Sequence, residues 1–120
     1  MNINSHKDLN VWKESMDLVE NIYSISNNFP KEEIYGLTSQ MRRCAVSIPS
    51  NIAEGAGRKG PKEFARFLHI SLGSLSELET QFEISIRLKY VPEEIQTEVI
   101  FEKIIYIRRM LSKLIKSINV

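Results

Sequence analysis

Apolar side chains recur every three or four positions over almost the whole chain, and this spacing decides its fold class. Because an α-helix has 3.6 residues per turn, such a spacing gathers apolar side chains on one face of a helix. Two neighbouring stripes follow it over residues 9–29; they are Leu9, Trp12, Met16, Val19 and Tyr23, and Val11, Leu18, Ile22, Ile25 and Phe29. The period therefore predicts an all-α protein whose first helix has a broad buried face.

The same spacing continues in three further segments. A second helix is expected to begin between residues 35 and 38 and to reach Ile52, a third to run from Pro61 to about residue 88, and a fourth from about Pro92 to the C-terminus. Pro49 falls inside the second segment, where it offers no N–H to the carbonyl of Ala45 and its ring crowds that carbonyl. We therefore expect one bent helix with a kink near Pro49.

The length of the chain and the short connections limit how these helices can assemble. Helices of about 20 residues are about 30 Å long, and short loops make sequential helices antiparallel neighbours. The 120 residues predict one domain over residues 1–120, an antiparallel up-down-up-down four-helix bundle. The chain has no run of 18 apolar residues and no apolar leader, so we expect a cytoplasmic protein without membrane contact.

Residues 55–60, Gly-Ala-Gly-Arg-Lys-Gly, match the G-x-G-x-x-G dinucleotide fingerprint. That fingerprint works between a strand and a helix of a parallel sheet, whereas the preceding "PSNIAE" ends a helical pattern. The glycines are better interpreted as a helix–helix turn. Gly55 or Gly57 would take the left-handed position that ends the second helix, Gly60 would allow the reversal, and Pro61 would begin the third helix.

The sequence offers no convincing catalytic or metal-binding set. Neither His6 nor His69 is preceded three residues earlier by a glutamate, so the Glu-x-x-His pairs of di-iron bundles are absent. Cys44 is the single cysteine, which rules out an intramolecular disulfide, and its apolar neighbours in the pattern place it in the core. We predict a protein that is not an enzyme and has no cofactor, metal site or catalytic residue.

Charge is segregated along the chain, although 16 basic and 15 acidic side chains nearly cancel. Residues 42–66 and 100–120 each carry a net charge of +4, whereas residues 1–41 carry −3 and residues 67–99 carry −4. Two basic blocks on a helical scaffold are compatible with contacts to nucleic-acid phosphates, but the sequence alone favours the alternative that they are solvated faces which pair with the acidic blocks. Whether the basic blocks converge on one surface distinguishes the two interpretations.

Polar residues also align along the second and third predicted helices. One face carries Arg43, Ser47, Asn51, Glu54 and Arg58, and the other carries Arg66, Gly73, Glu77 and Gln81. If the two faces meet, Glu77 would pair with Arg43, and Gly73 would allow close approach. We expect a structural polar network of Arg43, Asn51, Glu54 and Glu77, within the bundle or at a subunit interface, so that Arg43→Ala would lower stability.

Three stretches carry a resemblance to a known family: "LNVWKESMDLVENIY" at 9–23, "FPKEEIYGLTSQMRRCAVSIPSNIAEGAGR" at 29–58 and "EFARFLHISLGSLSELETQFEIS" at 63–85. The chain resembles the four-helix-bundle family encoded in bacterial 23S ribosomal RNA intervening sequences, of which "SIPSNIAEG" and "GSLSELETQ" are typical. The resemblance implies an all-helical bundle that assembles into a ring-like homopentamer. It implies no settled biochemical activity.

The chain is also similar to the accessory variability proteins of diversity-generating retroelements, whose basic pentamer surface binds nucleic acid and a reverse transcriptase. By that analogy the candidate nucleic-acid-binding residues are Arg42, Arg43, Arg58, Lys59, Lys62 and Arg66, followed by Arg108, Arg109 and Lys113. The leading hypothesis is a non-enzymatic homo-oligomer that binds RNA or DNA. The alternative is a protein-interaction scaffold, whose acidic region 67–99 and ring surface dock a partner such as a polymerase or reverse transcriptase.

Overall fold

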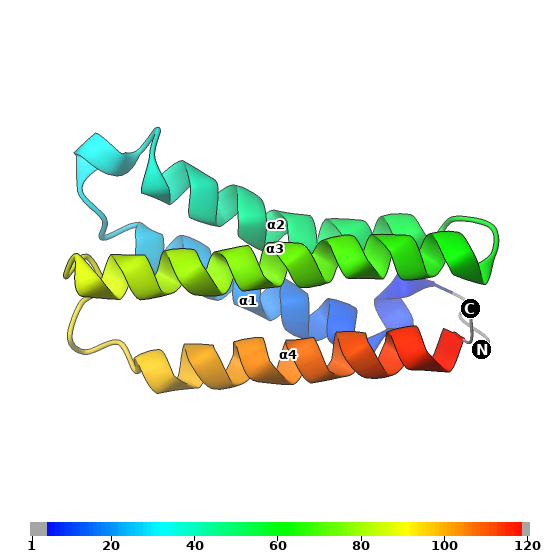
Figure 1. Cartoon of the computed structure of the whole chain (residues 1–120). Coiled ribbons are helices and arrows are strands. Elements are labelled where there is room, and N and C mark those ends of the chain that lie inside the picture. Colours follow the sequence, from blue (N-terminus) through cyan, green and yellow to red (C-terminus); the bar gives the residue numbers. More distant parts are fainter. Residues whose placement is uncertain (1–4, 119–120) are drawn as a thin grey trace.

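Residues 5–118 are described by a computed structural model, and they form four long helices joined by short loops (Figure 1). The α-helices are α1 (Asn10–Ser26), α2 (Leu37–Ala56), α3 (Pro61–Arg87) and α4 (Thr97–Ile118). Two 3-10 helices, η1 (His6–Asp8) and η2 (Lys31–Glu33), precede α1 and α2. The all-α prediction is confirmed, and no helix in this part of the chain is long and apolar enough to cross a membrane.

The helices form the predicted up-and-down bundle. Each helix packs against the next along the chain, and α4 closes the bundle against α1. This topology gathers η1, the α2–α3 turn and the C-terminal end of α4 at one end of the bundle. The loops at residues 27–36 and 88–96 lie together at the other end (Figure 1).

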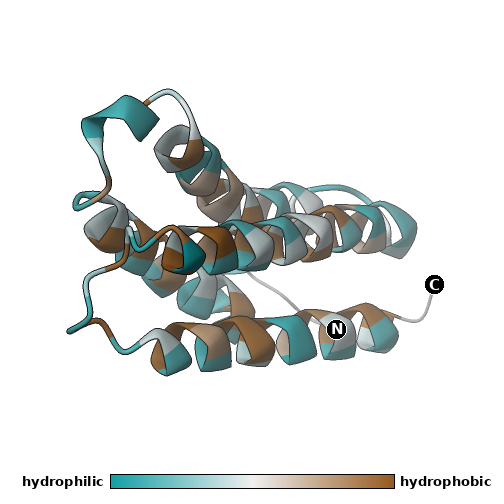
Figure 2. Cartoon of the chain, turned by 60° about the vertical axis from the view of Figure 1, so that its left-hand side comes forward, coloured by the Kyte–Doolittle hydropathy of each residue, from teal (hydrophilic) through white to brown (hydrophobic). Residues whose placement is uncertain are grey.

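The core uses one of the two apolar stripes of α1 more fully than the other. Val11, Leu18, Ile22, Ile25 and Phe29 are buried, whereas Met16 and Tyr23 of the other stripe are exposed. Brown and teal residues alternate along each helix in Figure 2, and the α2–α3 turn and η2 are mostly teal. The first helix is therefore buried along one broad stripe and borders solvent along the other.

Helix α2 continues through Pro49, as predicted. Pro49 and its neighbour Ile48 are buried, and Figure 1 shows α2 bending part-way along its length. The Ile48 carbonyl accepts a hydrogen bond of 2.9 Å from the Ser71 hydroxyl on α3. This bond ties α2 to α3 next to the proline.

The α2–α3 turn uses its glycines differently from the prediction. Gly55 lies inside α2, and Gly57 ends the helix with φ −84°, so neither is left-handed. The left-handed conformation falls on Gly60, with φ +94°, and α3 begins at Pro61 as expected. The difference arises because α2 extends to Ala56, which moves the reversal to the residue directly before Pro61.

Gly55 is required for close packing of α2 on α3. A Cβ at this position would lie 2.8 Å from the Phe67 Cβ, 3.0 Å from the Phe64 Cδ1 and 3.2 Å from the Phe64 carbonyl oxygen. Gly73 does not have the predicted role in close approach, because a Cβ there would meet open space. The approach of the two helices therefore occurs beside the turn and not in the middle of α3.

At the opposite end of the bundle, Glu33 of η2 links the start of α2 to the loop that follows α3. Its carboxylate accepts hydrogen bonds from the Leu37 backbone N–H at 3.0 Å and from the Tyr90 hydroxyl at 2.9 Å, and these bonds lower the pKa of Glu33. Helix α4 begins at Thr97, later than the predicted Pro92, because residues 92–96 form a turn. The hydrogen bond between Tyr90 and Glu33 therefore joins the loop at residues 88–96 to the loop at residues 27–36.

We predict opposite effects of two glycine-to-alanine substitutions. Gly55→Ala should lower the free energy of unfolding by about 1–3 kcal/mol, because the new methyl group meets Phe64 and Phe67. Gly73→Ala should raise it by up to about 1 kcal/mol, since alanine favours a helix interior and has space there. Denaturant unfolding of both variants measures the difference, and equal effects would contradict the packing assigned to Gly55.

Candidate nucleic-acid interface

The two ends of the bundle differ in charge. The end formed by η1, the α2–α3 turn and the last turns of α4, here called the basic end, carries seven basic and three acidic side chains. Its basic residues are Lys7, Arg58, Lys59, Lys62, Arg66, Lys113 and Lys116, and its acidic residues are Asp8, Glu54 and Glu63. The topology thus brings parts of both basic sequence blocks to one end.

The other end, here called the acidic end, carries the opposite excess. Residues 27–36 and 83–99 contain six acidic and three basic side chains. They are Glu32, Glu33, Glu83, Glu93, Glu94 and Glu98 against Lys31, Arg87 and Lys89, and Arg42 of α2 adds a fourth basic side chain at this end through its hydrogen bond to Asn27. The near-neutral net charge of the chain therefore conceals a bundle that is polarised along its length.

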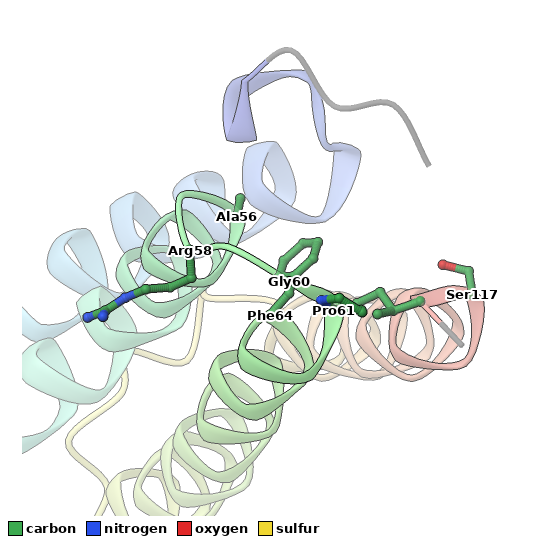
Figure 3. A pocket seen from close by; sticks show the side chains of 7 residues that line it. Ala56, Arg58, Gly60, Pro61, Phe64 and Ser117 are labelled. Atoms are coloured by element: carbon green, nitrogen blue, oxygen red, sulfur yellow. The ribbon is translucent and has the colours of Figure 1, made fainter. Parts of the chain in front are cut away.

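A shallow cleft joins the α2–α3 turn to α4 at the basic end. Ala56, Gly60, Pro61 and Phe64 line one side of it, and Ser117 and Ile118 line the other. Arg58 also borders the cleft, but its side chain extends away from Ser117 and alongside α2 (Figure 3). The basic end therefore presents a surface toward α4 and a second surface along the outer side of α2 and α3.

Arg58 and Arg66 occupy that outer surface and contact the same aromatic ring. The guanidinium carbon of Arg58 lies 5.1 Å from the ring centroid of Phe67, and that of Arg66 lies 4.4 Å from it. Arg58 also pairs with Glu54 at 2.9 Å, and Arg66 pairs with Glu63 at 3.0 Å. The hydrogen bond from Arg66 lowers the pKa of Glu63.

Lys59 and Lys62 complete the turn as exposed cations. Within residues 5–118, neither has a carboxylate within 4.0 Å. Lys113 and Arg109 are also exposed on α4. Within the described residues, neither of them has a carboxylate within 4.0 Å. These four side chains remain available to a ligand.

Arg42 and Arg108, two other predicted residues, are used in packing between helices. The Nε of Arg42 donates to the Ser26 hydroxyl at 2.8 Å, and its Nη2 donates to the Tyr23 carbonyl at 3.3 Å and to Asn27 at 3.2 Å. Its guanidinium also lies over the Tyr23 ring, 4.6 Å from the centroid. Arg42 therefore caps the C-terminal end of α1, where free carbonyl groups favour a cation.

Arg108 links α4 to α3 through Glu79, with 2.6 Å between Nη2 and Oε1. Both side chains are partly buried. This contact orients α4 on α3. We therefore interpret Arg108, like Arg42, as a residue that joins two helices instead of one that contacts a ligand.

The predicted polar faces of α2 and α3 do meet, and Ser47 and Ser74 hydrogen-bond across them at 2.8 Å. The four predicted members of a network nevertheless have separate partners. Asn51 donates to the carbonyl and hydroxyl of Ser47, Glu54 accepts from Arg58, and Glu77 accepts from Gln81. No ion pair joins Arg43 to Glu77 in the described chain, although both border one polar cleft. Within the bundle, these residues therefore form a set of local contacts instead of a single network, and the alternative of a network at a subunit interface stays a prediction.

Cys44 lies beside this cleft and is suited to packing. Burial, followed by the hydrogen bond and charge of Glu77, raises the pKa of the Cys44 thiol to about 11. The thiol is therefore protonated near neutral pH and is a poor nucleophile. No group of three histidine, cysteine, aspartate or glutamate side chains that could hold a metal ion occurs in residues 5–118.

Sequence reasoning missed the role of Phe67. Phe67 is one of the buried apolar residues of α3 and is 8% exposed. The two arginines over the ring come from the turn and from α3, eight residues apart in sequence, so helical periodicity gives no signal for their contact.

Comparison with known proteins fits this architecture. Residues 7–113 match the family model described as 23S rRNA-intervening sequence protein. The chain belongs to the 23S rRNA-intervening sequence protein family. One solved structure similar to this member is that of a protein of unknown function from the S23 ribosomal protein family of Bacteroides thetaiotaomicron. It has 27% sequence identity and a TM-score of 0.78, with 88% of this chain and 95% of that chain covered. No curated protein matches the chain.

For this 23S rRNA-intervening sequence protein, we predict that adjacent arginines differ in their effect on stability. Arg42→Ala should lower the free energy of unfolding by about 1–2 kcal/mol, because it removes the cap of α1 and its contact with Tyr23. Arg43→Ala should change it by less than about 0.5 kcal/mol, because Arg43 is an exposed residue.

Thermal and denaturant unfolding of the two variants provide the measurement. A large loss for Arg43→Ala, comparable with that for Arg42→Ala, would restore the single polar network and contradict the separate contacts.

Proposed function

We propose that this chain binds RNA or other nucleic acid without catalysis, through contacts between its basic end and backbone phosphates. The observation that carries the proposal is the convergence of the α2–α3 turn and the C-terminal turns of α4, which come from the two basic sequence blocks. Lysine and arginine side chains that neutralise phosphates release counterions, and this release favours binding at low salt. The exposed Lys59 and Lys62 are suited to such contacts.

Assembly into a homo-oligomer, with the pentamer implied by the family resemblance, would strengthen this binding. One basic end offers few phosphate contacts, whereas a ring would present several copies to one nucleic acid and convert weak contacts into avidity. Exposed apolar side chains on the outer faces of the helices are available for subunit contacts; they include Met16, Val46, Ile70, Ile84 and Ile105.

The acidic end favours a second function, a scaffold that docks a protein partner such as a polymerase or reverse transcriptase. Tyr35 is 95% exposed and Ile34 is 56% exposed, next to the Glu33 carboxylate that holds the loop in place. Tyrosine is often a dominant residue in protein interfaces, and a preformed loop loses little entropy on binding. This surface is separate from the basic end, so the two functions can be tested independently.

A charge-reversal experiment tests the leading function. The variant Arg58→Glu, Lys59→Glu, Lys62→Glu should weaken binding of a fluorescent hairpin RNA by more than about tenfold at 50 mM salt, and should flatten the dependence of affinity on salt. The matched control reverses Lys31, Arg87 and Lys89 at the acidic end, which makes the same change in net charge.

The control variant should bind RNA much more tightly than the basic-end variant. Absence of RNA and DNA binding by the unmodified chain at low salt would contradict the proposed function. Equal losses in both variants would show that only the total charge matters. A protein partner docked at Tyr35 should remain bound when the basic end is reversed.

A further inference from the structure

The ring of Phe67 brings two arginines together on the outer surface of the basic end. Because the guanidinium carbons of Arg58 and Arg66 lie 5.1 Å and 4.4 Å from the same centroid, they are less than about 10 Å from each other. One strand of a duplex advances about 3.4 Å along the axis per phosphate. This upper limit on their separation allows the two guanidinium groups to contact one phosphate or phosphates that are close together along one strand.

Each guanidinium is also held at one edge by a carboxylate. Glu54 accepts a hydrogen bond from the Nε of Arg58 at 3.0 Å, and the same carboxylate oxygen lies 2.9 Å from the Nη2 of Arg58 in the ion pair. Glu63 accepts from the Nε of Arg66 at 3.0 Å and from its Nη2 at 3.3 Å. Since a guanidinium has five N–H donors in one plane, the Nη1 donors and the second Nη2 hydrogen of each arginine remain free for another acceptor.

These contacts provide orientation more than stability. Exposed ion pairs contribute little to folding, and the arginine side chains here are 49% and 55% exposed. The ring below and the carboxylate beside each guanidinium nevertheless restrict its plane, which reduces the entropy lost when an anion binds. Arg87 has a comparable carboxylate contact with Glu83 at 3.6 Å but no aromatic ring beneath it in the described chain.

The close packing at Gly55 places the ring where both arginines can reach it. The missing Cβ of Gly55 allows the backbone of α2 to approach the Cβ of Phe67. Arg58 then follows three residues after Gly55, and Arg66 directly precedes Phe67. The first glycine of the G-x-G-x-x-G sequence thus acts through packing, because it brings α2 close to the Phe67 ring that both arginines contact.

We propose that Arg58 and Arg66 form a two-arginine clamp for the phosphodiester groups of a nucleic-acid backbone, with Phe67, Glu54 and Glu63 as positioning residues. The clamp rests on the proposed function and adds that orientation, not charge alone, determines affinity at this surface. Non-bridging phosphate oxygens accept the free donors in a bidentate manner, which a lysine cannot reproduce. Lys59 and Lys62 add attraction at longer range.

Charge-conserving variants test the clamp. Arg58→Lys with Arg66→Lys keeps the net charge but removes the planar donors, and should weaken binding of a fluorescent hairpin RNA about tenfold at 50 mM salt. Arg87→Lys, at the acidic end, should bind like the unmodified chain. Phe67→Leu should weaken binding several-fold without a change in charge, whereas Phe101→Leu, which replaces a partly buried aromatic residue on α4, should not.

The outcomes separate the clamp from the proposed function. If the double lysine variant binds RNA as tightly as the unmodified chain while the triple glutamate variant does not bind, the clamp is wrong and the proposed function stands. If the unmodified chain binds neither RNA nor DNA, both are wrong. Melting temperatures of all variants are measured alongside, and the double lysine variant decides the matter even if Phe67→Leu fails to fold.

Discussion

The close approach of α2 and α3 beside their turn is the constraint on which the rest of this structure depends. At Gly55 the backbone of α2 lies so near Phe67 that a methyl group has no room. The hydrogen bonds from Ser71 to Ile48 and between Ser47 and Ser74 continue the contact along the two helices. This pairing fixes the position of the turn, and with it the cations that the turn presents.

The bundle topology then converts segregation along the sequence into polarity in space. An up-and-down bundle places its two terminal segments beside the central turn, so parts of residues 42–66 and 100–120 meet although they are far apart in the chain. The two remaining loops bring several glutamates to the opposite end of the bundle. A hydrogen bond between Tyr90 and Glu33 joins these two loops. A chain with a net charge of +1 therefore has ends of opposite sign.

Periodicity predicted the fold well because burial of an apolar stripe governs each helix, and the Pro49 helix and the Pro61 start follow from local backbone chemistry. It predicted the site less well because side-chain partners depend on the final packing. Arg42 and Arg43 are adjacent and chemically identical, yet Arg42 caps α1 and Arg43 is exposed. Gly55 and Gly73 likewise differ only in what faces them, and no local pattern distinguishes a crowded helix interior from an open one.

The most direct test of nucleic-acid binding at the basic end is the acetylation rate of individual lysines, measured by mass spectrometry with and without a hairpin RNA. This measurement uses the unmodified chain in its own assembly state and reports each lysine separately. We predict that RNA slows the modification of Lys59, Lys62, Lys113 and Lys116 and leaves that of Lys31 and Lys89 unchanged. Protection of Lys31 and Lys89 with no protection at the α2–α3 turn would contradict it.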